Sequence, residues 1–181
     1  SMPPVKETAL AAKIPVYQPE TLKDFALLPV LEEVKPDIIV VVAYGKILPK
    51  YVLDFPSKGC VNLHASLLPK YRGAAPIQRA VMAGEKVTGL STMYMSEGMD
   101  EGDIIEQMEM PVGENETAGE LFARMAIAGG PFLLETLRKI ENGTAQRTPQ
   151  NHAKATYAPM LKPEEGRLPL ALASAEVYNH F

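Results

Sequence analysis

An asparagine and a histidine stand two residues apart in the stretch GCVNLHASLLPKYRGAAP, which runs from residue 59 to residue 76. Residues 59–65 have the pattern of a buried strand, in which alternate side chains share a face. Asn62 and His64 would therefore lie on one face, at the carboxyl end of the strand, where open α/β sheets bind ligands. An asparagine amide can donate to a developing oxyanion, and a histidine can move a proton or add positive charge. The simpler interpretation is that both are ordinary polar side chains whose hydrogen bonds are satisfied within the fold, without a role in catalysis.

The loop that follows this strand is a second candidate element. Residues 66–69 leave the strand, and residues 71–73 continue the loop into a helix that begins at Pro76. Loops in this position tend to carry function rather than packing. The loop therefore favours a functional interpretation of the Asn-x-His pair.

A third element is the acidic stretch EGMDEGD at residues 97–103. Two glycines among several acids between strands are typical of a solvated turn. Metal binding is a further alternative, but the spacing of an EF-hand is not present, and we expect no metal. The functional interpretation is that Asp100 faces His64, orients its ring and favours its charged form.

Cys60, the only cysteine, suggests a different chemistry, as the nucleophile of a Cys-His-Asp set with His64. Four residues along a strand span about 13 Å, at about 3.3 Å each, which exceeds hydrogen-bond reach. We therefore expect Cys60 to serve packing. A single cysteine also excludes an internal disulfide and a Cys-rich zinc site, and it suits a reducing compartment such as the cytoplasm.

The 181 residues, 46% of them hydrophobic, can bury one sizeable core, which predicts one domain. The formal net charge of −4 argues against general nucleic-acid binding, although it allows a local basic patch. The longest apolar run, residues 38–44, is far shorter than the roughly 20 residues that cross a bilayer. No secretory signal is recognisable, so we expect a cytoplasmic monomer without membrane contact.

Strands and helices alternate along the chain, which predicts an α/β domain with a mostly parallel sheet and flanking helices. Strands are expected at residues 15–18, 37–43, 59–65, 87–95 and 104–112. The second has the continuous β-branched pattern of a strand covered on both faces. Helices are expected at residues 4–13, 20–34 and 76–84, and from a capping box at Thr117 and Glu120 to about residue 142.

The two clusters together resemble the folate-dependent formyltransferase family, since VNLHASLLPKYRGAAPIQRA at residues 61–80 is followed by GMDEGD at residues 98–103. The segments AYGKILPK (43–50), YRGAAPIQRA (71–80) and TGLSTMYM (88–95) are similar to the branch that formylates initiator methionyl-tRNA. The resemblance runs from about residue 2 to at least residue 150. It implies a Rossmann-like fold and 10-formyltetrahydrofolate as the formyl donor.

The resemblance also implies roles for individual residues. Asn62, His64 and Asp100 would be the catalytic set: the first two would stabilise the oxyanion of a tetrahedral intermediate, and Asp100 would hold His64 and help to move the proton. The predicted folate-binding residues are the turn Ser66, Leu67, Leu68 and Pro69, with a cis bond between the last two, and two pocket walls formed by Lys46, Ile47 and Leu48 and by Glu97, Gly98 and Met99.

Members of the family normally begin with a strand and a glycine-containing loop, which we do not find before Met2, and they carry a small β-barrel after a linker. We therefore expect residues 1–168 to be a catalytic domain without its first strand, and residues 169–181 to begin the linker. Because the family's basic loop and barrel would both be absent, tRNA binding by this chain is expected to be weak or lost.

Three other functions stay open at this point. The same fold could formylate a small amine such as a nucleotide sugar, or the chain could be a folate-binding remnant without catalysis. A generic nucleotide-binding domain is disfavoured, because neither G-x-G-x-x-G nor a Walker loop is present.

Overall fold

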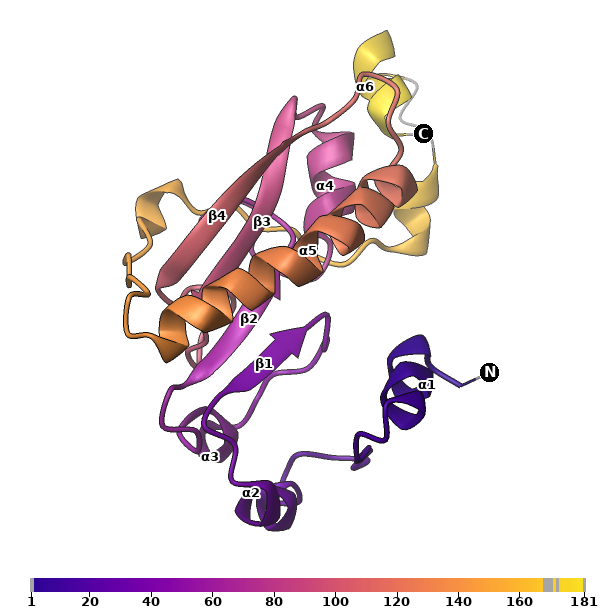
Figure 1. Cartoon of the computed structure of the whole chain (residues 1–181). Coiled ribbons are helices and arrows are strands. Elements are labelled where there is room, and N and C mark those ends of the chain that lie inside the picture. The colour runs from indigo at the N-terminus through magenta and orange to yellow at the C-terminus, as the bar shows by residue number, and fades with distance from the viewer. Residues whose placement is uncertain (1, 168–170, 172, 181) are drawn as a thin grey trace.

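A four-stranded sheet forms the centre of the structure, a computed structural model that describes residues 2–167, 171 and 173–180 (Figure 1). The strands are β1 (Ile39–Val42), β2 (Cys60–His64), β3 (Val87–Tyr94) and β4 (Ile104–Pro111), and they lie in this order across the sheet. The helices are α1 (Pro4–Ala11), α2 (Leu28–Val34), α3 (Lys50–Leu53), α4 (Pro76–Met82), α5 (Ala118–Glu141) and α6 (Ser174–His180). The predicted α/β class with flanking helices is confirmed.

The sheet is mixed, so the predicted mostly parallel arrangement is wrong. Only β1 and β2 are parallel; β2 and β3, and β3 and β4, are antiparallel. A parallel neighbour needs a crossover of a dozen or more residues, whereas the connection from β3 to β4 is the short segment 95–103. The connection from β2 to β3 contains α4, and the alternation of strand and helix there does not reveal that β3 runs antiparallel to β2.

Strand β1 is covered on one face, which corrects the expectation of a strand covered on both. Ile39 and Val41 pack against the cluster of Leu22, Leu31, Leu48 and Val52. Val40 and Val42, on the other face, are 39% and 53% exposed. Among the described residues, β2 is the only strand that pairs with β1.

Two predictions for the N-terminal part are wrong. Residues 15–18 form no strand, and the helix expected at residues 20–34 is confined to α2. Asp24 and Phe25 have positive φ angles of 53° and 58°, which a helix cannot continue through. Pro29 then falls in the first turn of α2, where its missing N–H removes no intrahelical hydrogen bond.

Helix α5 lies across one face of the sheet (Figure 1). Its start is the predicted capping box, in which Thr117 accepts from the Glu120 N–H while the Glu120 carboxylate accepts from the Thr117 N–H. Its buried side chains Leu121 and Met125 join a core cluster with Ile77, Leu90 and Met110. A Cβ on Gly129 would lie 3.0 Å from Leu63 of β2, so Leu63 marks the face of β2 that packs on α5. Asn62 and His64 therefore lie on the opposite face.

A segment that we call the strap, residues 148–158, returns from α5 to the loop at residues 69–75. Thr148 pairs with Ile104 at the start of β4 through two hydrogen bonds of 2.9 Å. The N–H of Ala75 then donates to Ala158 O, and that of Arg72 to Thr156 O. The predicted domain boundary between residues 168 and 169 lies outside the described residues, and no described helix is both long and apolar enough to cross a bilayer.

Candidate active site

Asn62, His64 and Asp100 converge on the face of the sheet turned away from α5. Asn62 Nδ2 donates to Asp100 Oδ1 at 3.4 Å, and His64 Nδ1 lies 3.7 Å from Asp100 Oδ2. The first contact is a long hydrogen bond, and the second is an ion-pair distance slightly beyond one. Both strand residues are buried, at 8% and 6% exposure. The structure thus brings the three residues together, as the strand pattern predicted for Asn62 and His64 and the family resemblance for Asp100, while their catalytic roles stay a prediction.

The histidine ring is oriented by an acceptor on each side. His64 Nε2 lies 2.9 Å from the Tyr71 carbonyl oxygen, which can only accept, so Nε2 carries a hydrogen. His64 Nδ1 faces the Asp100 carboxylate. The arrangement sets the His64 ring beside the Asn62 amide, and two such groups can stabilise an oxyanion.

The turn that carries Asp100 is held in an unusual conformation. Asp100 has φ +49°, in the left-handed region that a non-glycine residue occupies at some cost. Its Oδ2 accepts from the Gly73 N–H at 2.8 Å. A Cβ on Gly102 would lie 1.8 Å from the Tyr94 carbonyl oxygen, so the chain packs tightly there. Asp100 is therefore built into the site, although neighbouring Glu97 and Glu101 are exposed as in an ordinary solvated turn.

The predicted folate-binding turn is fixed to strands β3 and β4. Ser91 Oγ of β3 donates to Ser66 O at 2.6 Å and accepts from Leu68 N at 3.1 Å. Gln107 Nε2 of β4 donates to Leu68 O and to Ser91 Oγ, both at 2.9 Å. The Leu68–Pro69 peptide bond is cis, as predicted. Ser66 and Leu68 are buried, whereas Leu67 and Pro69 are half-buried.

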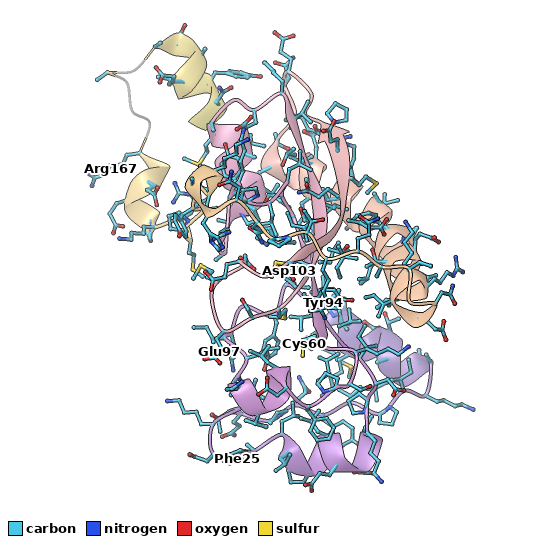
Figure 2. All side chains as sticks on the ribbon, turned by 90° about the vertical axis from the view of Figure 1, so that its left-hand side faces the viewer. Phe25, Cys60, Tyr94, Glu97, Asp103 and Arg167 are labelled. Carbon is cyan, nitrogen blue, oxygen red and sulfur yellow. The ribbon has the colours of Figure 1, made fainter. Side chains whose placement is uncertain are left out.

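An ion pair links the second predicted pocket wall to α3, the helix that follows the first wall along the chain. Glu97 Oε1 lies 3.7 Å from Lys50 Nζ in α3, and Figure 2 shows Glu97 beside this helix. In the first wall, Ile47 is 82% exposed and Lys46 is exposed, while Leu48 packs into the core cluster with Val52. In the second wall, Gly98 is half-buried and Met99 is exposed. The structure thus places apolar Ile47 and Met99 in solvent, and it commits the Leu48 side chain to packing.

Cys60 is a packing residue, as expected. It is 2% exposed, and Figure 2 shows it between the sheet and α3. Its Sγ donates to the carbonyl oxygens of Val52 at 3.5 Å and Leu53 at 3.7 Å. Burial raises the pKa of the Cys60 thiol to about 11, so the thiol stays protonated near neutral pH and is a poor nucleophile.

Tyr71, which orients His64, is itself held from two sides. Its φ is +59°, and its N–H donates to Thr156 Oγ1 at 2.9 Å. Its hydroxyl donates to Glu85 Oε1 at 2.8 Å. Burial, together with this hydrogen bond, raises the pKa of the Tyr71 phenol, so it remains a donor.

Sequence reasoning missed the residues that hold the site from behind. Ser91 and Gln107 are directly opposite each other on β3 and β4, and a polar residue at these positions of two predicted strands was a usable signal. Gln150 and Thr156 had no such signal, because no local pattern shows which distant loop a segment without regular structure will contact.

Comparison with known proteins agrees with this geometry. The family model described as "Formyl transferase" matches residues 2–137. Methionyl-tRNA formyltransferases of Alkaliphilus oremlandii and Acidobacterium capsulatum are 51% and 53% identical over 97% and 99% of this chain, which spans 57% and 58% of their lengths. The fold is also similar to phosphoribosylglycinamide formyltransferase from Bacillus halodurans, with 29% identity, a TM-score of 0.68 and coverage of 75% of this chain and 74% of that one.

A sugar 3N-formyltransferase solved with dTDP and 5-N-formyl-THF shares the fold over 97% of this chain and 61% of its own, with a TM-score of 0.79 at 21% identity. The family model covers most of the present chain and includes the strand, loop and turn that form the site. The chain therefore belongs to the formyl transferase family.

Proposed function

We propose that this chain carries the catalytic part of an enzyme that transfers a formyl group from 10-formyltetrahydrofolate to the amino group of initiator methionyl-tRNA. The observation that carries the proposal is the buried convergence of Asn62, His64 and Asp100. The choice of acceptor is supported by relatives named methionyl-tRNA formyltransferase at about 50% identity, although this chain spans little more than half of their length.

The donor supplies an activated formyl carbon, and the residues of the fixed turn and the two walls suit its ring system. Ile47 and Met99 are large apolar side chains left in solvent, at 82% and 59% exposure, on the loops predicted to enclose it. Exposed apolar side chains at a site rimmed by polar groups fit a flat, largely apolar ring. The turn at residues 66–69 supplies a rigid main chain to its edge.

Asn62 and His64 act on the charge that develops when the acceptor amine attacks the formyl carbon. The new C–N bond moves an electron pair onto the formyl oxygen. The Asn62 amide donates to that oxygen, a protonated His64 adds positive charge beside it, and groups of this kind contribute about 3 to 4 kcal/mol each. They act selectively, because the oxygen is more negative in the transition state than in the formyl group itself.

Asp100 serves the proton transfer. The attacking amine must lose a proton, and the departing folate nitrogen must gain one when its bond to the formyl carbon breaks. The Asp100 carboxylate faces both Asn62 and the His64 ring, so it can accept the proton in transit while it keeps the imidazolium in place. The net reaction leaves a formamide and tetrahydrofolate.

The charges of this chain support weak binding of tRNA by residues 1–181 alone. Affinity for tRNA draws on Lys and Arg contacts to phosphates. Of the basic residues near the site, Lys50 pairs with Asp54 and Glu97, Lys70 with Glu85, and Arg79 with Glu165, while Lys46 is exposed and belongs to none of these pairs. Arg72 is 2% exposed and unable to reach a phosphate in solution.

Formylation of charged initiator tRNA tests the proposal, with the 181-residue chain and the natural protein at its full length side by side. We expect the full-length protein to form formylmethionyl-tRNA, and the 181-residue chain to do so poorly or not at all. A small amine, such as an amino sugar nucleotide, serves as the second acceptor. Faster formylation of the small amine would overturn the assignment of the acceptor. Binding of 5-formyltetrahydrofolate without transfer to either acceptor would indicate a folate-binding protein instead.

A further inference from the structure

The carboxamide of Gln150 lies behind Asp100, on the main-chain side of the turn. Gln150 is 6% exposed. Its Nε2 donates to the carbonyl oxygens of Asp100 at 2.9 Å and Gly102 at 2.8 Å. Its Oε1 accepts from Arg72 Nε at 3.1 Å and from Arg72 Nη2 at 2.7 Å. Both donor positions and both acceptor positions of the carboxamide are therefore occupied.

The contact with Asp100 fixes a residue whose backbone conformation needs support. A non-glycine residue with positive φ persists only where its surroundings hold it, and Asp100 has φ +49°. The Gln150 amide holds the main-chain carbonyl of Asp100, while the Asp100 carboxylate faces Asn62 and His64 on the other side. Rotation of the turn would displace both carboxylate oxygens from the site.

Arg72 determines which way the Gln150 carboxamide points. A guanidinium only donates, so it requires the amide oxygen, and the NH₂ group is then turned toward the two carbonyls. Arg72 is 2% exposed, and none of the ion pairs in the described part of the chain includes it. Its other side-chain contact is His152 Nδ1, at 3.4 Å. The buried cation is thus held by neutral acceptors, Gln150 foremost.

We propose that Gln150 is a positioning residue, which holds Asp100 in the orientation that serves His64 and Asn62, and that Arg72 orients the Gln150 carboxamide for this task. The kinetic part of the inference rests on the proposed formyl transfer. The geometric part does not, because it concerns only the relation of Asp100 to the His64 ring.

Gln150→Glu in the natural protein at its full length separates positioning from folding. The glutamate can still pair with Arg72, and as a carboxylate it gives this buried cation a counter-charge, so the fold is retained. It loses both donors to the turn and presents an oxygen to the carbonyls of Asp100 and Gly102. Since a displacement of about 1 Å can cost about 100-fold, we expect kcat to fall about 10- to 100-fold, with the KM for the formyl donor nearly unchanged. The loss of two buried donors lowers the thermal midpoint. A cooperative transition well above the assay temperature shows that the fold persists, so the loss of kcat is not a loss of folded protein.

Gln146→Glu is the matched control, because it makes the same chemical change at an exposed glutamine four residues earlier. It should leave kcat unchanged. Gln150→Glu is then combined with Asp100→Ala. If Gln150 acts through Asp100, the substitution has little further effect once the carboxylate is gone. If kcat of the double variant falls by the product of the two single-variant losses, the inference is wrong.

The ¹⁵N signals of the His64 imidazole, recorded without substrates and assigned by their loss in His64→Ala, provide a readout independent of turnover. We expect them to shift in Gln150→Glu but not in Gln146→Glu. Arg72→Lys, which keeps the charge but loses the two-donor fork, should shift them too. Shifted signals in a protein that formylates no acceptor would support positioning and reject the proposed function. Unshifted signals in both variants, with kcat equal to that of the control, would reject positioning.

Discussion

Removal of the Ser91 hydroxyl should destabilise the protein and loosen the turn at residues 66–69. Ser91 is fully buried, donates to Ser66 O, and accepts from Leu68 N and from Gln107 Nε2. Ser91→Ala leaves these groups without that partner, and a buried polar group that loses its partner costs about 1–3 kcal/mol. Gln107 keeps its hydrogen bond to Leu68 O. Most of the cost therefore comes from the two main-chain groups that lose their partner, Ser66 O and the Leu68 N–H. We expect a loss of about 2–4 kcal/mol in the free energy of unfolding.

Ser66→Ala is the matched control for this prediction. Ser66 is also fully buried, but its hydroxyl makes a single hydrogen bond, to Lys70 O at 2.6 Å. Its loss should cost about 1 kcal/mol. Urea unfolding measures both free energies, and titration with 5-formyltetrahydrofolate should show weaker binding to the Ser91 variant. Equal destabilisation by the two variants would refute the view that the turn is held chiefly from β3.

Three further outcomes follow from the site and its surroundings. Asn62→Ala should lower kcat about 100- to 1,000-fold with folate affinity nearly unchanged, whereas Cys60→Ala should be mild; the opposite pattern in steady-state kinetics would restore the cysteine mechanism. The Arg79 guanidinium holds the pKa of the Glu165 carboxyl at about 2, below its usual 4.5, so the stability from this pair is present above about pH 4.5 and is lost as the pH falls toward 2. Urea unfolding between pH 6 and pH 3 should show a smaller acid loss in Glu165→Gln, and an identical loss would contradict the pairing. Gly102→Ala would place a Cβ 1.8 Å from a main-chain oxygen, so it should lower both the thermal midpoint and kcat; unchanged values would show that the turn can yield.

Local patterns in the sequence predicted the parts of the structure that short-range physics determines. The period of two places Asn62 and His64 on one face of β2, and the reciprocal hydrogen bonds of Thr117 and Glu120 begin α5 where the capping box indicated. The direction of β3 was not predictable in this way, because a helix between two strands fits parallel and antiparallel neighbours alike.

Within the candidate site, the sequence indicated the residues that converge there better than those that support them. Asp100 was identified from the family resemblance, and the structure brings it to His64. Gln150 was not identified, because its partners are distant in the sequence. Its carboxamide contacts Asp100 and Gly102, which lie 50 and 48 residues earlier, and Arg72, which lies 78 residues earlier. Contacts over such separations depend on the assembled fold rather than on any local preference.

The strap has a consequence for the order in which the protein matures during synthesis. All four strands have been made by residue 111, but several hydrogen bonds of the loop at residues 69–75 are made with residues 148–158, and the side-chain contacts that join them span 78 to 85 residues of sequence. Closure of such long loops is entropically unfavourable until the intervening chain is organised. At about 5–20 residues per second, a nascent chain therefore spends on the order of seconds with its four strands made and this loop held only by earlier residues such as Glu85 and Asp100. A chain that stops on the ribosome before residue 148 would carry Asn62, His64 and Asp100 without Gln150 and the strap behind them, so the proposed activity would arise only once the strap is made.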